Sequence, residues 1–112
     1  FKMVGFEDRV DPAIETVLYR LSQEALTNAL KHSRAKHFRL SIVKGYPKII
    51  FLAEDDGIGF VSGEFDQPQH GLGLLSMKER AAMLGGNFSL RTSPGEGVRI
   101  RIEIPITVRT RD

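Results

Sequence analysis

The feature that most constrains the fold is a buried strand that runs into two acids and two glycines. Residues 48–54 form a short apolar run rich in β-branched side chains, a pattern that predicts a strand in the core. The sequence DDGIGF follows directly, at residues 55–60. Glycines permit positive φ and a close approach to the main chain, and a carboxylate offers only hydrogen-bond acceptors. A plain turn explains this stretch, and so does a site for a flat ring that carries donors, such as adenine.

Helix and strand patterns alternate along the rest of the chain. An N-cap at Asp11 and a proline after it predict a helix from Pro12 to residue 31 or 33, with apolar residues at every third or fourth position. A second helix is expected at 74–84, ended by two glycines, and strands at 1–6, 37–43, 48–54, 88–91 and 98–104. Residues 61–70 lack periodicity and are longer than most loops, which is typical of a functional lid. This order predicts one α/β domain, residues 1–112, built as a two-layer sandwich with helices on one face of a mixed sheet.

The composition narrows the class of partner. Sixteen basic and 14 acidic residues leave a net charge of +2, too mild for a nucleic-acid surface. The absence of cysteine excludes disulfides and thiolate metal sites and is compatible with a reducing compartment. No apolar run approaches the roughly 18 residues of a membrane span, so we expect no membrane contact. Because the chain starts at Phe1 without an initiator methionine, we expect it to be a segment of a longer protein.

Polar side chains gather on one flank of the first helix. Glu24 and Asn28 are one turn apart and therefore lie on the same side, with Lys31 beside them and His32 close by. An asparagine oxygen suits Mg²⁺, and a carboxylate at that spacing can orient or deprotonate a nucleophile. A solvated helix flank is the alternative interpretation. On the opposite side of this helix, a second apolar strip formed by Tyr19, Leu26 and Leu30 is expected to be covered by another helix or by a partner.

Glycines also precede the second helix, in the sequence HGLGL at residues 70–74. Free backbone N–H groups and the helix dipole favour anions at such a place, and His70 is a further donor. The pattern fails as a dinucleotide fingerprint because no strand precedes it and the third glycine is missing. The acid-glycine turn likewise fails as a calcium loop, since Gly57 and Gly59 carry no ligand oxygens.

Taken together, four stretches carry a resemblance that none carries alone. EALTNALKH at 24–32, DDGIGF at 55–60, HGLGL at 70–74 and GEG at 95–97 resemble, in order and spacing, the four nucleotide boxes of the histidine-kinase-type ATPases. The chain most resembles the sensor kinases that pair with response regulators having helix-turn-helix output domains. The likeness extends from about Pro12 to Pro105.

The resemblance implies a Bergerat α/β sandwich that binds ATP with Mg²⁺ under a mobile lid. By this resemblance, Asp55 would accept a hydrogen bond from the adenine amino group, and Gly57 and Gly59 would let the ring and the lid approach. Asn28 would ligate Mg²⁺, and Lys31 and His32 would contact phosphates. Gly71 and Gly73 would hold the phosphate tail, and Glu24 would position the nucleophile or accept its proton. Phe60, His70, Leu72 and Leu74 belong to the same boxes and to the expected nucleotide site. Two positions depart from the pattern: Val98 replaces a usual threonine, and Ser76 stands where relatives often have glycine.

The activity implied is transfer of the γ-phosphoryl group of ATP to a histidine on a separate dimerisation domain. The partners implied are the dimerisation and phosphoacceptor helices of a homodimeric parent kinase and a response regulator. The implied location is the cytoplasm, with membrane anchoring of the parent left open. None of His32, His37 and His70 is expected to be phosphorylated. The alternatives are an ATP-hydrolysing clamp of the same superfamily and a non-catalytic nucleotide-binding regulatory module.

Overall fold

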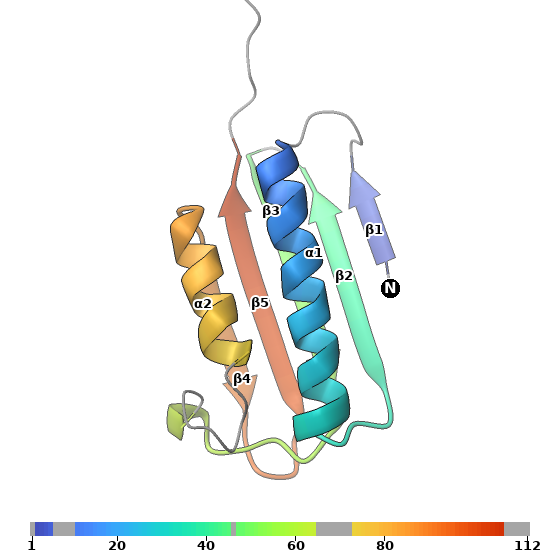
Figure 1. Ribbon diagram of the computed structural model, residues 1–112. Coiled ribbons are helices and arrows are strands. Elements are labelled where there is room, and N and C mark those ends of the chain that lie inside the picture. The colour runs from blue at the N-terminus through green and yellow to red at the C-terminus, as the bar shows by residue number, and fades with distance from the viewer. Residues whose placement is uncertain (1, 6–10, 46, 65–72, 107–112) are drawn as a thin grey trace, which may run out of the picture.

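The structure of the protein, a computed structural model, describes residues 2–5, 11–45, 47–64 and 73–106. Within these residues, five strands form one sheet in the order β1-β2-β3-β5-β4, and α1 and α2 lie side by side on one of its faces (Figure 1). Strand β1 pairs parallel to β2, whereas the other three pairings are antiparallel. The predicted α/β architecture, a mixed sheet covered on one face by helices, is therefore confirmed.

The elements follow the predicted order closely. They are β1 (Lys2–Gly5), α1 (Pro12–Thr27), the π-helical turn η1 (Asn28–His32), β2 (Phe38–Lys44), β3 (Lys48–Asp55), the short 3-10 turn η2 (Ser62–Glu64), α2 (Gly73–Met83), β4 (Asn87–Thr92) and β5 (Val98–Pro105). Most of the expected lid, together with His70, Gly71 and Leu72, lies outside the described residues.

The first helix starts as expected but ends differently. The Asp11 side chain accepts a hydrogen bond from the Ala13 N–H at 2.8 Å, with proline as the first helical residue. The expected α-helix gives way at Asn28 to a π-helical turn, in which the Ser33 N–H donates to the Asn28 carbonyl at 2.9 Å. A π turn takes one more residue per hydrogen-bonded ring. The 3.6-residue spacing used to place Lys31 beside Asn28 therefore does not hold beyond residue 28.

The core lies between the helices and the covered face of the sheet. Along β3, the buried residues Ile49, Phe51 and Ala53 alternate with more exposed ones, and they share one cluster with Leu21 of α1 and Met77 of α2. The next residue in this alternation is number 55, at the end of the strand. Because side chains alternate between the two faces of a strand, Asp55, the first acid of DDGIGF, lies on the helix-covered side, at the edge of the core.

The second apolar strip of α1 faces solvent. Tyr19, Leu26 and Leu30 have 63%, 44% and 62% of their surface exposed, and no described element covers them. The alternative that another helix of the described chain covers this strip is therefore wrong. None of the described helices combines the length and apolar character needed to cross a bilayer.

Candidate functional site

Asp55 ends β3 with a half-buried carboxylate. Its oxygen accepts the Gly57 N–H at 2.9 Å, and the Ser33 side chain forms a further hydrogen bond with it. Partial burial raises the pKa of Asp55 above its ordinary value, although hydrogen bonds from Gly57, Ser33 and Val98 act in the opposite direction. A partly desolvated carboxylate gains more from an incoming donor than a fully hydrated one does. Asp55 therefore fits the acceptor role predicted for it.

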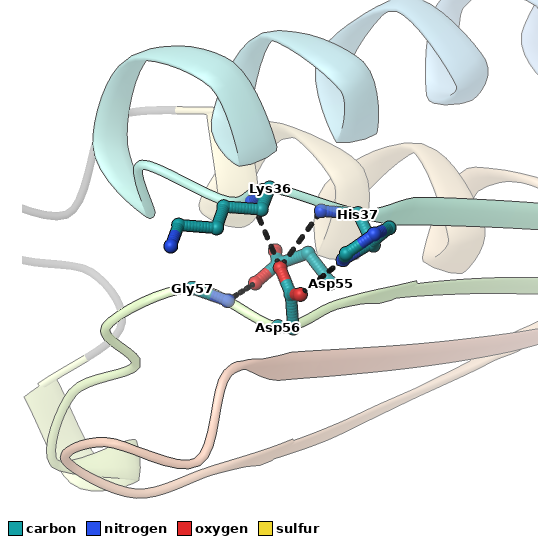
Figure 2. A network of polar contacts seen from close by, with 5 residues as sticks. All are labelled: Lys36, His37, Asp55, Asp56 and Gly57. Atoms are coloured by element: carbon teal, nitrogen blue, oxygen red, sulfur yellow. Dashed lines mark hydrogen bonds and ion pairs between the residues drawn. The ribbon is translucent and has the colours of Figure 1, made fainter.

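The neighbouring acid, Asp56, belongs to a different network (Figure 2). One of its oxygens accepts the backbone N–H groups of Lys36 at 2.9 Å and His37 at 2.8 Å, and the other lies 2.7 Å from Nδ1 of the His37 ring. These bonds fasten the turn after β3 to the segment that leads into β2. The hydrogen bonds from His37, followed by that from Lys36, lower the pKa of Asp56 to about 2. Two adjacent acids thus do different things: Asp56 holds the turn in which Asp55 is presented.

The pH dependence of stability tests this role of Asp56. Its pKa falls from 3.8 to about 2 on folding, so its contribution is complete above pH 3.8 and is lost as pH falls through about 2. We expect Asp56→Asn to lower the free energy of unfolding at neutral pH and to flatten its decline in this acid window. Urea unfolding at a series of pH values measures both effects, with Glu79→Gln on exposed α2 surface as the control. Equal slopes for the variant and the unaltered chain would contradict this role.

The glycines of DDGIGF are in contact with the chain's own backbone. A β-carbon at Gly57 would overlap the Ser33 carbonyl oxygen, and one at Gly59, whose φ is +61°, would overlap the Ser93 carbonyl oxygen. The Ile58 N–H also donates to Ser33 O at 2.8 Å. Both glycines are thus required by close packing of three segments. Their predicted part in admitting a ring and a lid remains a prediction.

Asn28 is a buried polar residue whose carboxamide has no partner in the part of the chain that the structure describes. Only 3% of its surface is exposed, and its carboxamide makes no hydrogen bond within the described residues. Most buried polar groups are hydrogen-bonded, so an exception calls for an explanation such as an ion or a ligand. One turn earlier, the Glu24 carboxylate lies against the start of α2, where a β-carbon at Gly73 would overlap its Oε2 atom. The fold therefore brings Glu24 of the first predicted box against Gly73 of the third.

The remaining predicted site residues fall into two groups. Lys31 and His32 are exposed on η1. Phe60 and Leu74 are buried, with 8% and 0% of their surface exposed, and both belong to the core cluster. Their side chains serve packing, so Leu74 has only main-chain groups to offer a ligand at the start of α2.

A cavity of about 490 Å³ opens at the adjoining ends of β3, β4 and β5. Its strand lining comes from two neighbouring rows: Asp55, Val98 and Thr92 on the helix-covered face, and Glu54, Arg99 and Arg91 on the opposite face. Its size is within the roughly 300–1,000 Å³ usual for ligand sites. Glu24 and Asn28 do not line this cavity. The sequence analysis missed Thr92 because its place beside Asp55 depends on strand register, for which the residue pattern carries no signal.

Comparison with known proteins identifies the family of the chain. Residues 13–108 match the model of the family described as histidine kinase-, DNA gyrase B-, and HSP90-like ATPase. The chain is 39% identical over 107 residues to the signal transduction histidine-protein kinase/phosphatase DegS of Brevibacillus brevis, covering 96% of this chain and 27% of that protein. It is also 39% identical over 99 residues to the oxygen sensor histidine kinase NreB of Staphylococcus carnosus, covering 88% and 28%. The chain thus spans about a quarter of the length of these relatives.

Solved structures show the same fold. The ATP binding domain of PrrB from Mycobacterium tuberculosis superposes with a TM-score of 0.66 at 30% identity, covering 82% of this chain and 68% of that one. The histidine kinase AdeS of Acinetobacter baumannii gives 0.73 at 19% identity, covering 96% and 53%, which supports the fold alone. The resemblance seen in the four sequence boxes is confirmed by the family match. The chain belongs to the family of histidine kinase-, DNA gyrase B- and HSP90-like ATPases.

Proposed function

We propose that this domain binds ATP with Mg²⁺ and donates the γ-phosphoryl group to a histidine on the dimerisation helices of its parent sensor kinase. The single observation that carries the proposal is the buried carboxamide of Asn28, which has no hydrogen-bond partner among the residues that the structure describes. It stands one helical turn from a carboxylate that lies against the start of α2. A polar group buried without a partner is best explained by a ligand that completes its hydrogen bonding or coordination.

The described residues suit a magnesium ion to which the protein supplies a single ligand. Within the described residues no three His, Cys, Asp or Glu side chains gather as a metal site. Mg²⁺ usually takes one or two protein ligands and shares its remaining positions between water and substrate phosphates. Asn28 would supply the protein oxygen. When bound, the ion neutralises charge that develops on the phosphates during transfer.

The other residues of the proposed site would bind the nucleotide and orient the reacting groups. Asp55 would accept the adenine amino group, and the amides that open α2 from Gly73 onward would hold phosphate oxygens. Lys31 and His32 would add positive charge or donors on the solvent side. Transfer forms a bond from phosphorus to the ring nitrogen of the acceptor histidine and breaks the bond to the ADP oxygen. Glu24 would orient that histidine or accept its proton.

The proposal extends to the parent protein. DegS and NreB carry the name of histidine kinase, and on this basis we propose a homodimeric sensor kinase with a response regulator as its phosphorylation partner. We place the domain in the cytoplasm.

The test has two stages. Isothermal titration with a non-hydrolysable ATP analogue is expected to give a Kd between micromolar and millimolar, tighter with Mg²⁺ than with EDTA. A histidine-bearing dimerisation domain is then added with labelled ATP, and label should pass to it. No heat of binding in the first stage would overturn the proposal. Binding without transfer to any acceptor, together with release of free phosphate, would favour the ATP-hydrolysing clamp.

A further inference from the structure

Thr92 is the last residue of β4 and stands in one row with Asp55. The register pairs Thr92 with Val98 across β4 and β5, and Val98 with Asp55 across β5 and β3. Residues directly opposite one another in a sheet point to the same face. The three side chains therefore lie side by side at the sheet end, and all three line the cavity beside Asp55.

The Thr92 hydroxyl is fully engaged as a donor. It donates to the Gly97 carbonyl at 2.6 Å and accepts the Phe60 N–H at 3.2 Å. A threonine hydroxyl has one hydrogen to donate. While this arrangement lasts, Thr92 cannot donate to a ligand and does not replace the hydroxyl that Val98 lacks. A role in binding can instead be exerted through the groups that the hydroxyl holds.

Those groups belong to the two segments that frame Asp55. Gly97, at φ +71°, packs so closely on the end of β3 that a β-carbon there would overlap the Asp55 carbonyl oxygen. Two residues earlier, the Gly95 N–H donates to the Ile58 carbonyl at 2.6 Å. One hydroxyl thus joins the turn after β3, through Phe60, to the turn between β4 and β5, through Gly97.

We propose that Thr92 is a positioning residue for purine binding: its hydroxyl fixes the two turns that form the cavity wall beside Asp55. This inference rests on the proposed function. Without the hydroxyl, its part-buried hydrogen bonds with Phe60 N–H and Gly97 C=O are lost, and the wall against which the base would lie is no longer held by them. The effect belongs to the base end of the nucleotide. Adenosine and ATP should therefore be affected by the same factor.

The experiment compares Thr92→Val, which keeps the shape and removes the hydroxyl, with Thr92→Ser, which keeps the hydroxyl. Calorimetric titrations use adenosine and ATP with Mg²⁺, at a temperature where circular dichroism shows each variant folded. We expect Thr92→Val to weaken both ligands about tenfold and Thr92→Ser to stay within about twofold, since only the valine variant loses the two hydrogen bonds made by the hydroxyl. Thr16→Val is the matched control, because the Thr16 hydroxyl also bonds to a backbone carbonyl, that of Pro12 at 3.1 Å, at the far end of α1.

Two results would overturn the role of Thr92: unchanged affinity of Thr92→Val whatever its melting temperature, or an equal loss in Thr92→Ser. If the valine variant does not fold, amide exchange on the unaltered chain decides instead. Adenosine should then slow exchange at the Phe60 and Gly95 amides, and unchanged rates at both would reject the proposal. The failure of the proposed function looks different, because in that case the unaltered chain itself binds neither adenosine nor ATP.

Discussion

Replacing Asn28 with alanine is expected to abolish phosphoryl transfer, by about 100-fold or more, the usual loss when one charge-stabilising contact to the transition state is removed. Binding of ATP should change far less, because the base and most phosphate contacts remain. Transfer of labelled phosphoryl to an added dimerisation domain measures the first quantity, and calorimetry measures the second. The variant should fold, since alanine suits a buried helical position at least as well as a carboxamide that bonds to none of the described residues.

Asn87→Ala provides the matched control. Asn87 is exposed at the start of β4, so the same change in chemistry is made on the surface. We expect this control to transfer phosphoryl at the rate of the unaltered chain. Asn28→Asp supplies a second test, because it keeps an oxygen but adds charge to a buried place. Transfer by Asn28→Ala at near-normal rate would reject the metal-binding role of this residue.

The second large effect is expected at the base end of the site. Asp55→Asn should weaken ATP binding by roughly 10- to 150-fold, the range that follows when a hydrogen bond to a charged acceptor is lost. An amide places a donor where the adenine amino group needs an acceptor. Calorimetric titration with ATP and Mg²⁺ measures the change, with Glu79→Gln on the exposed face of α2 as the charge-matched control. An unchanged Kd would contradict the adenine assignment.

The pH dependence separates loss of binding at Asp55 from loss of folding. Because burial raises its pKa in the folded state, ionised Asp55 lowers stability as pH rises through the raised value. Asp55→Asn should therefore leave the free energy of unfolding at neutral pH unchanged or higher, although ATP binding is weakened. In the unaltered chain, affinity should decline as pH falls through the raised pKa. A variant that both unfolds and fails to bind would not fit this account.

Much of the fold is readable from local patterns. The N-cap at Asp11, the alternation along residues 48–54 and the glycine stop at Gly85, whose φ is +73°, each act over a few residues, and the structure contains the helix, strand and stop that they predict. The separation of Glu24 and Asn28 by one turn is likewise local. That Glu24 meets Gly73 of α2 follows from how two helices pack on one sheet. This contact was not predicted, because the resemblance of the ordered motifs assigned each residue a role but no neighbour.

What could not be predicted depends on geometry between distant segments. The π turn at Asn28–His32 arises where α1 meets the segment leading to β2, and no residue type in it signals the extra residue. The strand alternation and the resemblance single out Asp55, but nothing in the sequence shows that Asp56 is bound by the backbone of Lys36 and His37. The role of Thr92 likewise follows only from register.

The place of β5 in the sheet has a consequence for how the domain is made. This strand is the last one in the described part of the chain, yet it lies between β3 and β4 and pairs with both along most of its length. On the ribosome, β3 and β4 emerge first and stay unjoined until residues 98–105 leave the exit tunnel. The sheet therefore closes only at the end of synthesis of this segment, and a nascent chain that stalls before Val98 has exposed strand edges on which it can aggregate.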